Sequence, residues 1–269
     1  MIPLIADHVW QSSLFAAAAG IVTLALRTNR ARVRYAVWFA ASMKFLIPFA
    51  ALIWLGGLTP RPVRESPTVR AGWISVALKV GAPVASRGEP VTSVPAHHNN
   101  LLPAALIWGV GFSVVAALWI VRWRRVARLR HTAAPVSGFA IGIPVMSSHG
   151  VFGPAVWGFF RPVLLLPEGF AQRLDPAQLR AIVAHELCHV RRKDNLTAAI
   201  HMLVQAIFWF HPLVWWIGAK LIEERERACD EAVVSSGNPP RVYAEGILNV
   251  CKICLESPLA CVAESPART

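Results

Sequence analysis

Charged residues are scarce in this 269-residue chain, at 16% against roughly a quarter of a typical soluble domain. Acidic residues are the scarcest, with 15 Asp and Glu against 27 Lys and Arg, so the formal net charge is +12. Hydrophobic residues make up 55% of the chain. This composition excludes a disordered chain, a coiled coil and an ordinary cytosolic enzyme, because a soluble fold would expose too much apolar surface. The sequence therefore predicts a membrane protein.

The sequence also lacks the marks of a nucleic-acid-binding protein, despite its positive charge. Its Arg residues form two clusters, at residues 27–34 and 122–130, and both directly adjoin apolar runs. No recognition motif or interleaved aromatic platform accompanies them. This placement is typical of the cytoplasmic flanks of membrane spans. We therefore expect the lipid bilayer, and no direct nucleic acid, as a partner.

Three apolar runs reach the length of about 20 residues that a bilayer crossing requires. The runs are residues 9–26, 35–58 and 101–121. No positively charged segment precedes the first run, so it does not have the pattern of a signal peptide. With an outer loop at residues 59–100, the three runs form a membrane domain over residues 1–121. Lys44 lies inside the second run, and we expect it to face the interior of the helix bundle.

The basic clusters also predict the orientation. The positive-inside rule predicts a multi-pass protein of the cell (inner) membrane. Its N-terminus would lie on the outer side of that membrane and residues 122–269 in the cytoplasm. All five cysteines follow the second basic cluster, as expected for reduced thiols in a cytoplasmic part. Cys251 and Cys254 form a C-x-x-C without a second pair, so we interpret them as free thiols. Cys188 and Cys229 are interpreted as small buried residues.

Residues 122–269 carry the signals of an α+β domain. Two β-leaning segments, 140–148 and 155–166, are separated by Gly and Pro and predict a small hairpin-like sheet. Asp175 is the predicted N-cap of a helix that has Pro176 at its first position and ends near Lys193. Two further helices are expected, one from Pro212 to about Gly237 and one over residues 243–255.

The helix that begins at Pro176 carries the pattern H-E-x-x-H, as His185-Glu186-Leu187-Cys188-His189. Residues four apart share one helix face, so both imidazoles can bind one Zn²⁺ ion. Glu186 can act as general base on a metal-bound water. The motif taken alone is also compatible with two surface histidines and an exposed glutamate.

A catalytic zinc needs a third protein ligand and an open position for water. The pattern E-x-x-x-D at Glu226 to Asp230 places two acidic groups on one face of the next helix. We predict that Glu226 is the third ligand and that Asp230 accepts the N–H of a liganding histidine, His185. Glu223 lies on nearly the same face and is the alternative third ligand.

Residues 196–222 form a fourth apolar stretch, of 27 residues, between the two motifs. A single crossing would put His185 and Glu226 on opposite sides of the bilayer, and two crossings need about 40 residues. The stretch is therefore predicted to enter and return as a re-entrant or interfacial hairpin that turns at His211-Pro212. We expect its tryptophans at headgroup depth and its histidines in helix packing: Trp209, Trp215 and Trp216, with His201 and His211. The alternative is a hairpin packed wholly under the cytoplasmic domain.

These features resemble the BlaR/MecR-type antirepressor metallopeptidases, the membrane zinc proteases of β-lactam-sensing receptors. The resemblance covers the three spans, residues 161–167, HELCHVRRKDN at 185–195 and EERERACDE at 223–231. It implies a cytoplasmic gluzincin domain in which His185, His189 and Glu226 bind zinc and Glu186 is the catalytic base. It further implies a substrate-binding edge strand, for which 155–166 is the candidate, and proteolytic signalling that is commonly directed at a transcriptional repressor.

The sequence departs from those receptors at its C-terminus. The receptors continue into a fourth span and an extracytoplasmic penicillin-binding sensor, whereas this sequence ends at Thr269 without a Ser-x-x-Lys motif for acylation. β-Lactam sensing is therefore not transferred. We expect either that the sequence is a fragment or that its input comes through the outer loop or a partner.

Together these observations predict a mainly α membrane protein. It would have three transmembrane helices, a cytoplasmic α+β gluzincin-like zinc metallopeptidase domain and a membrane-associated helical hairpin. The predicted function is that of a zinc metalloendopeptidase that cleaves a cytoplasmic protein, or itself, in transmembrane signalling. The alternatives are a non-proteolytic transducer or scaffold that retains a structural zinc, and a DNA-binding regulator acting through residues 122–130. Three residues are candidates for oxyanion stabilisation: Tyr243, Arg241 and His149.

Overall fold

Two of the described helices are long and apolar enough to cross a membrane. The computed structural model describes residues 2–47, 102–151 and 153–256. The two helices are α1 (Ile2–Ala25), with its apolar part at Ala6–Ala25, and α5 (Leu102–Thr132). They agree with the first and third predicted runs, but α5 continues past residue 121 through the second basic cluster.

The second predicted run is not one continuous helix. The helix α2 (Ala31–Leu46) begins before the predicted start and ends at Leu46, where Ile47 has the extended angles φ −109° and ψ 105°. Ile47 precedes Pro48, and proline disfavours the helical conformation in the residue before it. The 16 residues of α2 span about 24 Å, less than the ~30 Å core of a bilayer. Residues 48–58 of the predicted span and the predicted loop 59–100 lie outside the described residues.

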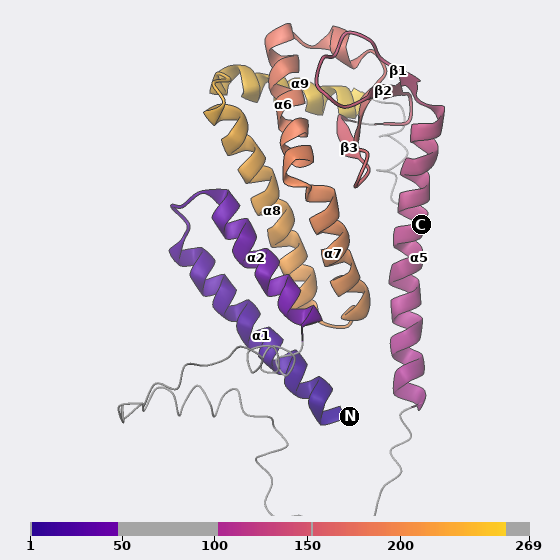
Figure 1. Ribbon diagram of the computed structural model, residues 1–269, viewed down its shortest axis with the longest axis vertical. Helices are drawn as coiled ribbons and strands as arrows, with labels where there is room; N and C mark the ends of the chain where they lie inside the picture. Colours follow the sequence, from indigo (N-terminus) through magenta and orange to yellow (C-terminus); the bar gives the residue numbers. More distant parts are fainter. Residues whose placement is uncertain (1, 48–101, 152, 257–269) are drawn as a thin grey trace, which may run out of the picture.

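The fourth apolar stretch folds as two helices with the break where the sequence predicts it. These helices are α7 (Asp194–Ile207) and α8 (Pro212–Ser235), and His211 adopts an extended conformation before the first proline of α8. The two helices pack beside α1 and α2 as a bundle (Figure 1). One buried cluster joins all four helices: Ala16, Ala19, Trp38, Ala41, Phe45, Val204, Val214, Ile217 and Leu221.

Polar side chains also cross-link this bundle. His201 Nδ1 lies 2.8 Å from the Ser42 hydroxyl, and His211 Nε2 lies 3.0 Å from the Ser13 hydroxyl. The two histidines therefore pair with serines of α2 and α1, in the packing role expected of them. The Lys44 ammonium is half-buried and donates to the Ile47 carbonyl at 3.4 Å.

The long helix α5 stands beside the bundle and none of its residues is buried. It contacts α7 and the turn after it, where Trp108 Nε1 donates to the Ile207 carbonyl at 2.9 Å and Trp209 Nε1 donates to the Trp108 carbonyl at 3.2 Å. Trp209 also covers Gly111, where a Cβ atom would overlap the indole ring. Trp209 therefore lies beside the middle of the apolar half of α5.

The sheet has four short strands in the order β1-β2-β4-β3. The strands are β1 (Ala134–Pro135), β2 (Val145–Ser148), β3 (Ala155–Trp157) and β4 (Val163–Pro167). The predicted strand 155–166 is in fact the antiparallel pair β3–β4, which bends at Gly158 (φ 104°). The predicted hairpin between 140–148 and 155–166 is wrong, because β2 pairs with β4 in parallel.

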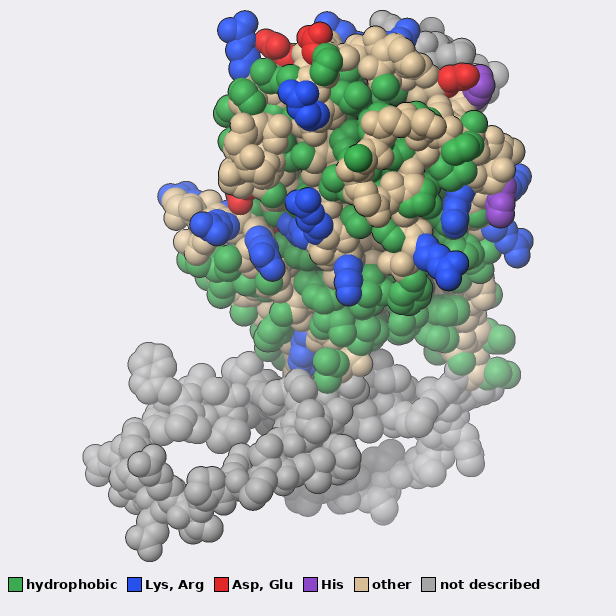
Figure 2. Space-filling model, turned by 45° about the horizontal axis from the view of Figure 1, so that its top comes forward, with side chains coloured by type: hydrophobic (Ala, Val, Ile, Leu, Met, Phe, Trp, Pro, Cys, Tyr) green, Lys and Arg blue, Asp and Glu red, His purple; other side chains and the backbone are tan. Residues whose placement is uncertain are grey.

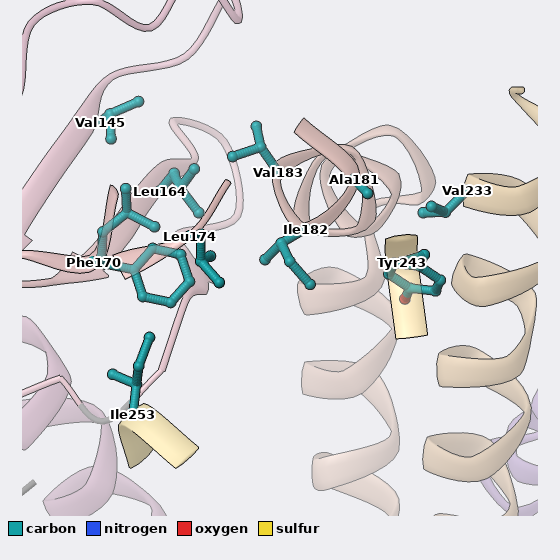
Figure 3. Packing of buried hydrophobic residues seen from close by; sticks show 11 residues of the cluster. Val145, Leu164, Phe170, Leu174, Ala181, Ile182, Val183, Val233, Tyr243 and Ile253 are labelled. Atoms are coloured by element: carbon teal, nitrogen blue, oxygen red, sulfur yellow. The ribbon is translucent and has the colours of Figure 1, made fainter. Parts of the chain in front are cut away.

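The sheet packs on α6 (Pro176–Arg192) and α9 (Pro240–Glu256). The short 3₁₀ helix η2 (Phe170–Arg173) connects β4 to α6. Figure 3 shows Leu164 and Phe170 on one side of this core and Ile182 and Tyr243 on the other. The five residues of β4, one of the two inner strands of the sheet, are all buried. This core fixes α6 against the sheet and so positions the H-E-x-x-H motif.

The molecular surface has a banded distribution of side chains. In Figure 2 hydrophobic side chains gather on the lower half of the described part, and Lys and Arg lie along the upper margin of that band. The apolar residues of α5 are among the most exposed, such as Ile107 at 66% and Val110 at 64%. An apolar band with a basic margin is the pattern that membrane insertion requires.

Candidate metal centre

The helix α6 presents His185 and His189 toward α8. Asp175 precedes the helix in an extended conformation, Pro176 occupies its first turn, and Lys193 ends it in the left-handed region at φ 55°. The Lys193 N–H donates to the His189 and Val190 carbonyls, and α7 begins at the next residue. The bounds of this helix agree with those predicted from the sequence.

The side chains of His185, His189 and Glu226 converge on one point between α6 and α8. The two Nε2 atoms lie 3.2 Å apart, and Glu226 Oε2 lies 3.4 Å from His185 Nε2 and 3.6 Å from His189 Nε2. Ligands 2.0–2.1 Å from a tetrahedral Zn²⁺ ion would be separated by about 3.3 Å. The three donor atoms therefore fit a zinc ion in both chemistry and spacing.

Arg225 holds the Glu226 carboxylate in this orientation. Its Nε and Nη2 donate to Glu226 Oε1 at 2.9 and 2.7 Å, which leaves Oε2 directed at the histidines. Although burial raises the pKa of Glu226, its hydrogen bonds to both histidines and to Arg225 lower the pKa well below the usual range. Glu226 is therefore an ionised carboxylate, as a metal ligand must be.

A hydrogen-bonded pair on α8 and α9 orients His185. The Tyr243 hydroxyl donates to Asp230 Oδ1 at 2.6 Å and lies 2.7 Å from His185 Nδ1, which is itself 3.2 Å from Asp230 Oδ1. Because the hydroxyl proton is given to Asp230, the hydroxyl oxygen accepts from His185 Nδ1–H. Asp230 thus lies beside His185 as predicted, but Tyr243 shares the contact. The lone pair of His185 Nε2 remains directed at the metal site.

The corresponding partner of His189 is Asp194, the first residue of α7. Asp194 Oδ2 lies 2.7 Å from His189 Nδ1, and its side chain is 2% exposed. Burial disfavours the charged form of His189, but hydrogen bonds to Asp194 and Glu226 outweigh it and raise the pKa of His189 to about 9. Sequence reasoning missed Asp194; the available signal was an acidic residue immediately after the basic last turn of the motif helix.

Replacing Asp194 with asparagine is expected to weaken zinc binding about 10–100-fold, the usual cost of losing the carboxylate behind a liganding histidine. The amide has the same shape but cannot raise the basicity of His189. Competition with a chromophoric chelator measures the affinity. Asp175→Asn is the matched control, because this exposed aspartate precedes the motif helix α6 and makes no side-chain cap. Equal zinc affinities in the two variants would contradict the role given to Asp194.

Glu186 lies on the same helix beside the candidate metal donors. Burial raises its pKa to about 7, although the nearby histidines oppose the rise. A general base is most effective when its pKa is close to the working pH. Glu186 therefore has the proton affinity that the base of a hydrolytic site requires.

Several other sequence candidates lie away from this centre. Glu223 instead bonds to Lys220 at 2.7 Å and to Arg227 at 2.6 Å on the outer side of α8. Arg241 pairs with Glu245, and the exposed His149 pairs with Glu168, so neither donates into the site. The Tyr243 hydroxyl already bonds to His185 and donates its proton to Asp230, so of the three oxyanion candidates it lies at the centre without a free donor. The described cysteines are free thiols, of which Cys188 and Cys229 are buried as predicted.

The edge strand of the sheet lies next to the motif helix. β3 is the outer neighbour of β4 and contacts α6. Asn195 Nδ2 donates to the Val156 and Gly158 carbonyls at 3.1 and 3.0 Å, which ties β3 to the start of α7. Of the predicted substrate strand 155–166, only the β3 part lies at the edge of the sheet, because β4 is paired on both sides, and the Val156 and Gly158 carbonyls at that edge accept from Asn195. Asn195 was not identified from the sequence.

Comparisons with known proteins agree with this geometry. The family model of the BlaR1 peptidase M56 matches residues 7–268. The chain is 29% identical to the regulatory protein BlaR1 of Bacillus licheniformis over 119 residues, 44% of this chain and 20% of that protein. It is 25% identical to the methicillin resistance mecR1 protein of Staphylococcus aureus (strain Mu50 / ATCC 700699) over 128 residues, 47% of this chain and 22% of that protein. The chain thus spans about a fifth of the length of these relatives. Because the family model matches almost the whole sequence, the chain belongs to the BlaR1 peptidase M56 family.

Proposed function

We propose that this chain is a membrane-embedded zinc metalloendopeptidase of the gluzincin type that acts in transmembrane signalling. One observation carries the proposal: two imidazole nitrogens and a carboxylate oxygen lie 3.2–3.6 Å apart, with Glu186 next to them in the sequence. Each imidazole has a hydrogen-bonded partner at its other nitrogen. Three electron-rich atoms held this close favour a bound cation, and two histidines with one carboxylate are a common donor set of catalytic zinc.

Different residues of the chain would bind the metal, transfer the proton and bind the substrate. His185, His189 and Glu226 would hold a zinc ion, which when bound supplies Lewis acidity to a water and to the scissile carbonyl. Glu186 accepts a proton from the attacking water and returns it to the leaving amine. The outer edge of β3 is the candidate to receive an extended substrate segment as an added strand, which would replace Asn195 as the partner of the Val156 and Gly158 carbonyls.

Removing the metal tests the assignment. Treatment of the purified chain with 1,10-phenanthroline is expected to abolish the appearance of new protein N-termini, in the chain itself and in an added cytosolic extract. Added Zn²⁺ should restore cleavage, because the donor atoms are held in place by their own hydrogen bonds. Mass spectrometry of labelled N-termini measures both. Cleavage that persists after zinc has been removed would contradict the proposal.

The second candidate function is a transducer that keeps a structural zinc and cleaves nothing. It would bind one zinc per chain and yield no zinc-dependent N-termini. The position of Glu186 favours the peptidase, since a structural site has no use for a half-buried carboxylate whose pKa is close to 7.

We further propose that the α7–α8 hairpin lies within the bilayer and that the peptidase part faces the cytoplasm. The apolar helix α1 contributes Ala16 and Ala19 to the cluster that contains Val204 and Ile217 of the hairpin. If α1 crosses the membrane, these hairpin residues lie at the same depth as its centre. The contacts support the re-entrant arrangement over a hairpin packed wholly under the cytoplasmic domain.

Thiol labelling distinguishes these arrangements. Cysteines introduced as Leu196→Cys and Lys220→Cys, at the basal ends of the two arms, are expected to react with a membrane-impermeant maleimide only after the cells are permeabilised. Ser86→Cys in the predicted outer loop is the control and should react in intact cells. Reaction of Lys220→Cys from outside while Leu196→Cys stays protected would mean that the stretch crosses the membrane.

The names of the relatives suggest the biological setting. One is a regulatory protein and another a methicillin resistance protein. We propose a cytoplasmic protein substrate of the repressor class, or the chain itself, as the target of cleavage. A candidate repressor would be identified by N-termini that depend on Glu186 and map to a DNA-binding protein.

A further inference from the structure

A groove of about 410 Å³ lies between α1, α2 and α8. Its apolar half is formed by Gly20, Trp38 and Trp216. The indole rings of the two tryptophans meet edge to face, with their centroids 4.8 Å apart. A Cβ atom on Gly20 would lie 3.2 Å from the Trp216 ring, so the glycine gives the groove its depth. At the rim, Ile21 and Leu24 of α1 are 69% and 71% exposed. The apolar half therefore opens toward the face of α1 that would meet lipid.

The other half of the groove is charged. Arg34 and Glu224 form a buried ion pair at 2.8 Å, and Arg34 also donates to the Arg27 and Asn29 carbonyls. These two groups neutralise each other and form the floor. Around them, Lys220 and Arg227 share the single carboxylate of Glu223.

Arg27 completes the charged half, and its exposed guanidinium has no ion pair within the described part of the chain. The charged half of the groove thus carries two positive charges in excess. A cavity of this size with an apolar end and a cationic end has the chemistry of an amphiphile with an anionic head.

We propose that this groove binds one anionic phospholipid. An acyl chain would lie along Gly20 and Trp216, and the phosphate would lie between Arg27 and Lys220. The long stems of Arg and Lys can reach from an apolar surface to a headgroup. The proposal rests on the membrane placement of α1 put forward above, and it is independent of peptidase activity.

The occupant would bridge two parts of the fold that otherwise touch little. Helix α1 has few direct contacts with α8, whereas both contact α2 extensively. A phosphate bound by Arg27 and Lys220 would tie the end of α1 to the turn of α8 that precedes Glu226. The lipid would thus stabilise the segment that carries the third metal donor.

Native mass spectrometry of the full chain in detergent tests the proposal, with phosphatidylglycerol as the probe and phosphatidylcholine as its zwitterionic counterpart. The wild type is expected to retain one phosphatidylglycerol per chain. The double variant Arg27→Ala/Lys220→Ala should bind it about 25-fold more weakly, from about fivefold for each basic residue at an anionic lipid surface. The charge-matched control is Arg30→Ala/Arg32→Ala, since these exposed residues belong to the same basic cluster but do not line the groove.

A second variant tests the apolar half without changing charge. Gly20→Leu would fill the space beside Trp216 and should also release the lipid, while circular dichroism and zinc content report that the chain remains folded. The proposal is overturned if both double variants lose the lipid equally, if neither does, or if phosphatidylcholine is retained as well as phosphatidylglycerol. It is also overturned if the wild type carries a second copy of the chain in place of a lipid.

Discussion

Replacing Glu186 with glutamine is expected to lower cleavage about 10²–10⁴-fold, the range over which a positioned general base contributes. Glutamine keeps the shape of the side chain but cannot accept a proton from the attacking water. The zinc content should stay near one per chain, because the three donor atoms belong to other residues. New N-termini measured by mass spectrometry give the activity, and atomic emission gives the metal.

Glu245→Gln is the matched control for this change. Glu245 is a glutamate of α9 that pairs with Arg241 at the surface, so its replacement should leave both cleavage and zinc unchanged. Full activity in the Glu186 variant would remove Glu186 from the mechanism. Loss of zinc along with activity would instead mean that Glu186 supports the metal site and would leave its role as base without evidence.

The second large effect is expected at the third metal donor. Glu226→Gln should weaken zinc binding more than about 100-fold, a larger loss than that for a residue behind a ligand. The neutral amide is a poorer donor, and it leaves Arg225 without its carboxylate partner. Glu223→Gln should leave zinc affinity unchanged, because that carboxylate bonds to Lys220 and Arg227 away from the histidines.

The pair of variants decides between the two candidate ligands, which lie three residues apart on one helix. Competition titrations with a chromophoric chelator measure both affinities under the same conditions. If Glu223→Gln releases zinc and Glu226→Gln retains it, the assignment is reversed. If both variants release zinc, both carboxylates support the site. That result would contradict the assignment, because Glu223 bonds to Lys220 and Arg227 away from the histidines.

The parts of the site that follow from helical periodicity were predictable from the sequence. His185 and His189 are one turn apart, Glu226 and Asp230 are one turn apart, and the structure brings both pairs together between α6 and α8. The hairpin followed from a length argument: too few residues separate the motifs for two crossings. Its break before Pro212 is where the backbone chemistry of proline puts it.

The parts that depend on contacts between distant segments were not predictable in this way. The pairing of Tyr243 with His185 requires α9 to fold back against α6, and no periodicity reports that. The parallel pairing of β2 with β4 depends on how the chain between them crosses the sheet. Helix α2 ends earlier than its hydropathy suggests, because hydropathy measures apolar length and takes no account of a proline at position 48.

Asp194 has two places in this molecule: it is the first residue of the hairpin helix α7 and the hydrogen-bond partner of His189. Lys193 alone separates the two helices, and its left-handed conformation leaves no slack between them. A tilt of α7 would therefore shift the His189 imidazole, because a single hydrogen bond of 2.7 Å joins the imidazole to Asp194. The apolar hairpin and the candidate metal centre are thus joined without an intervening loop.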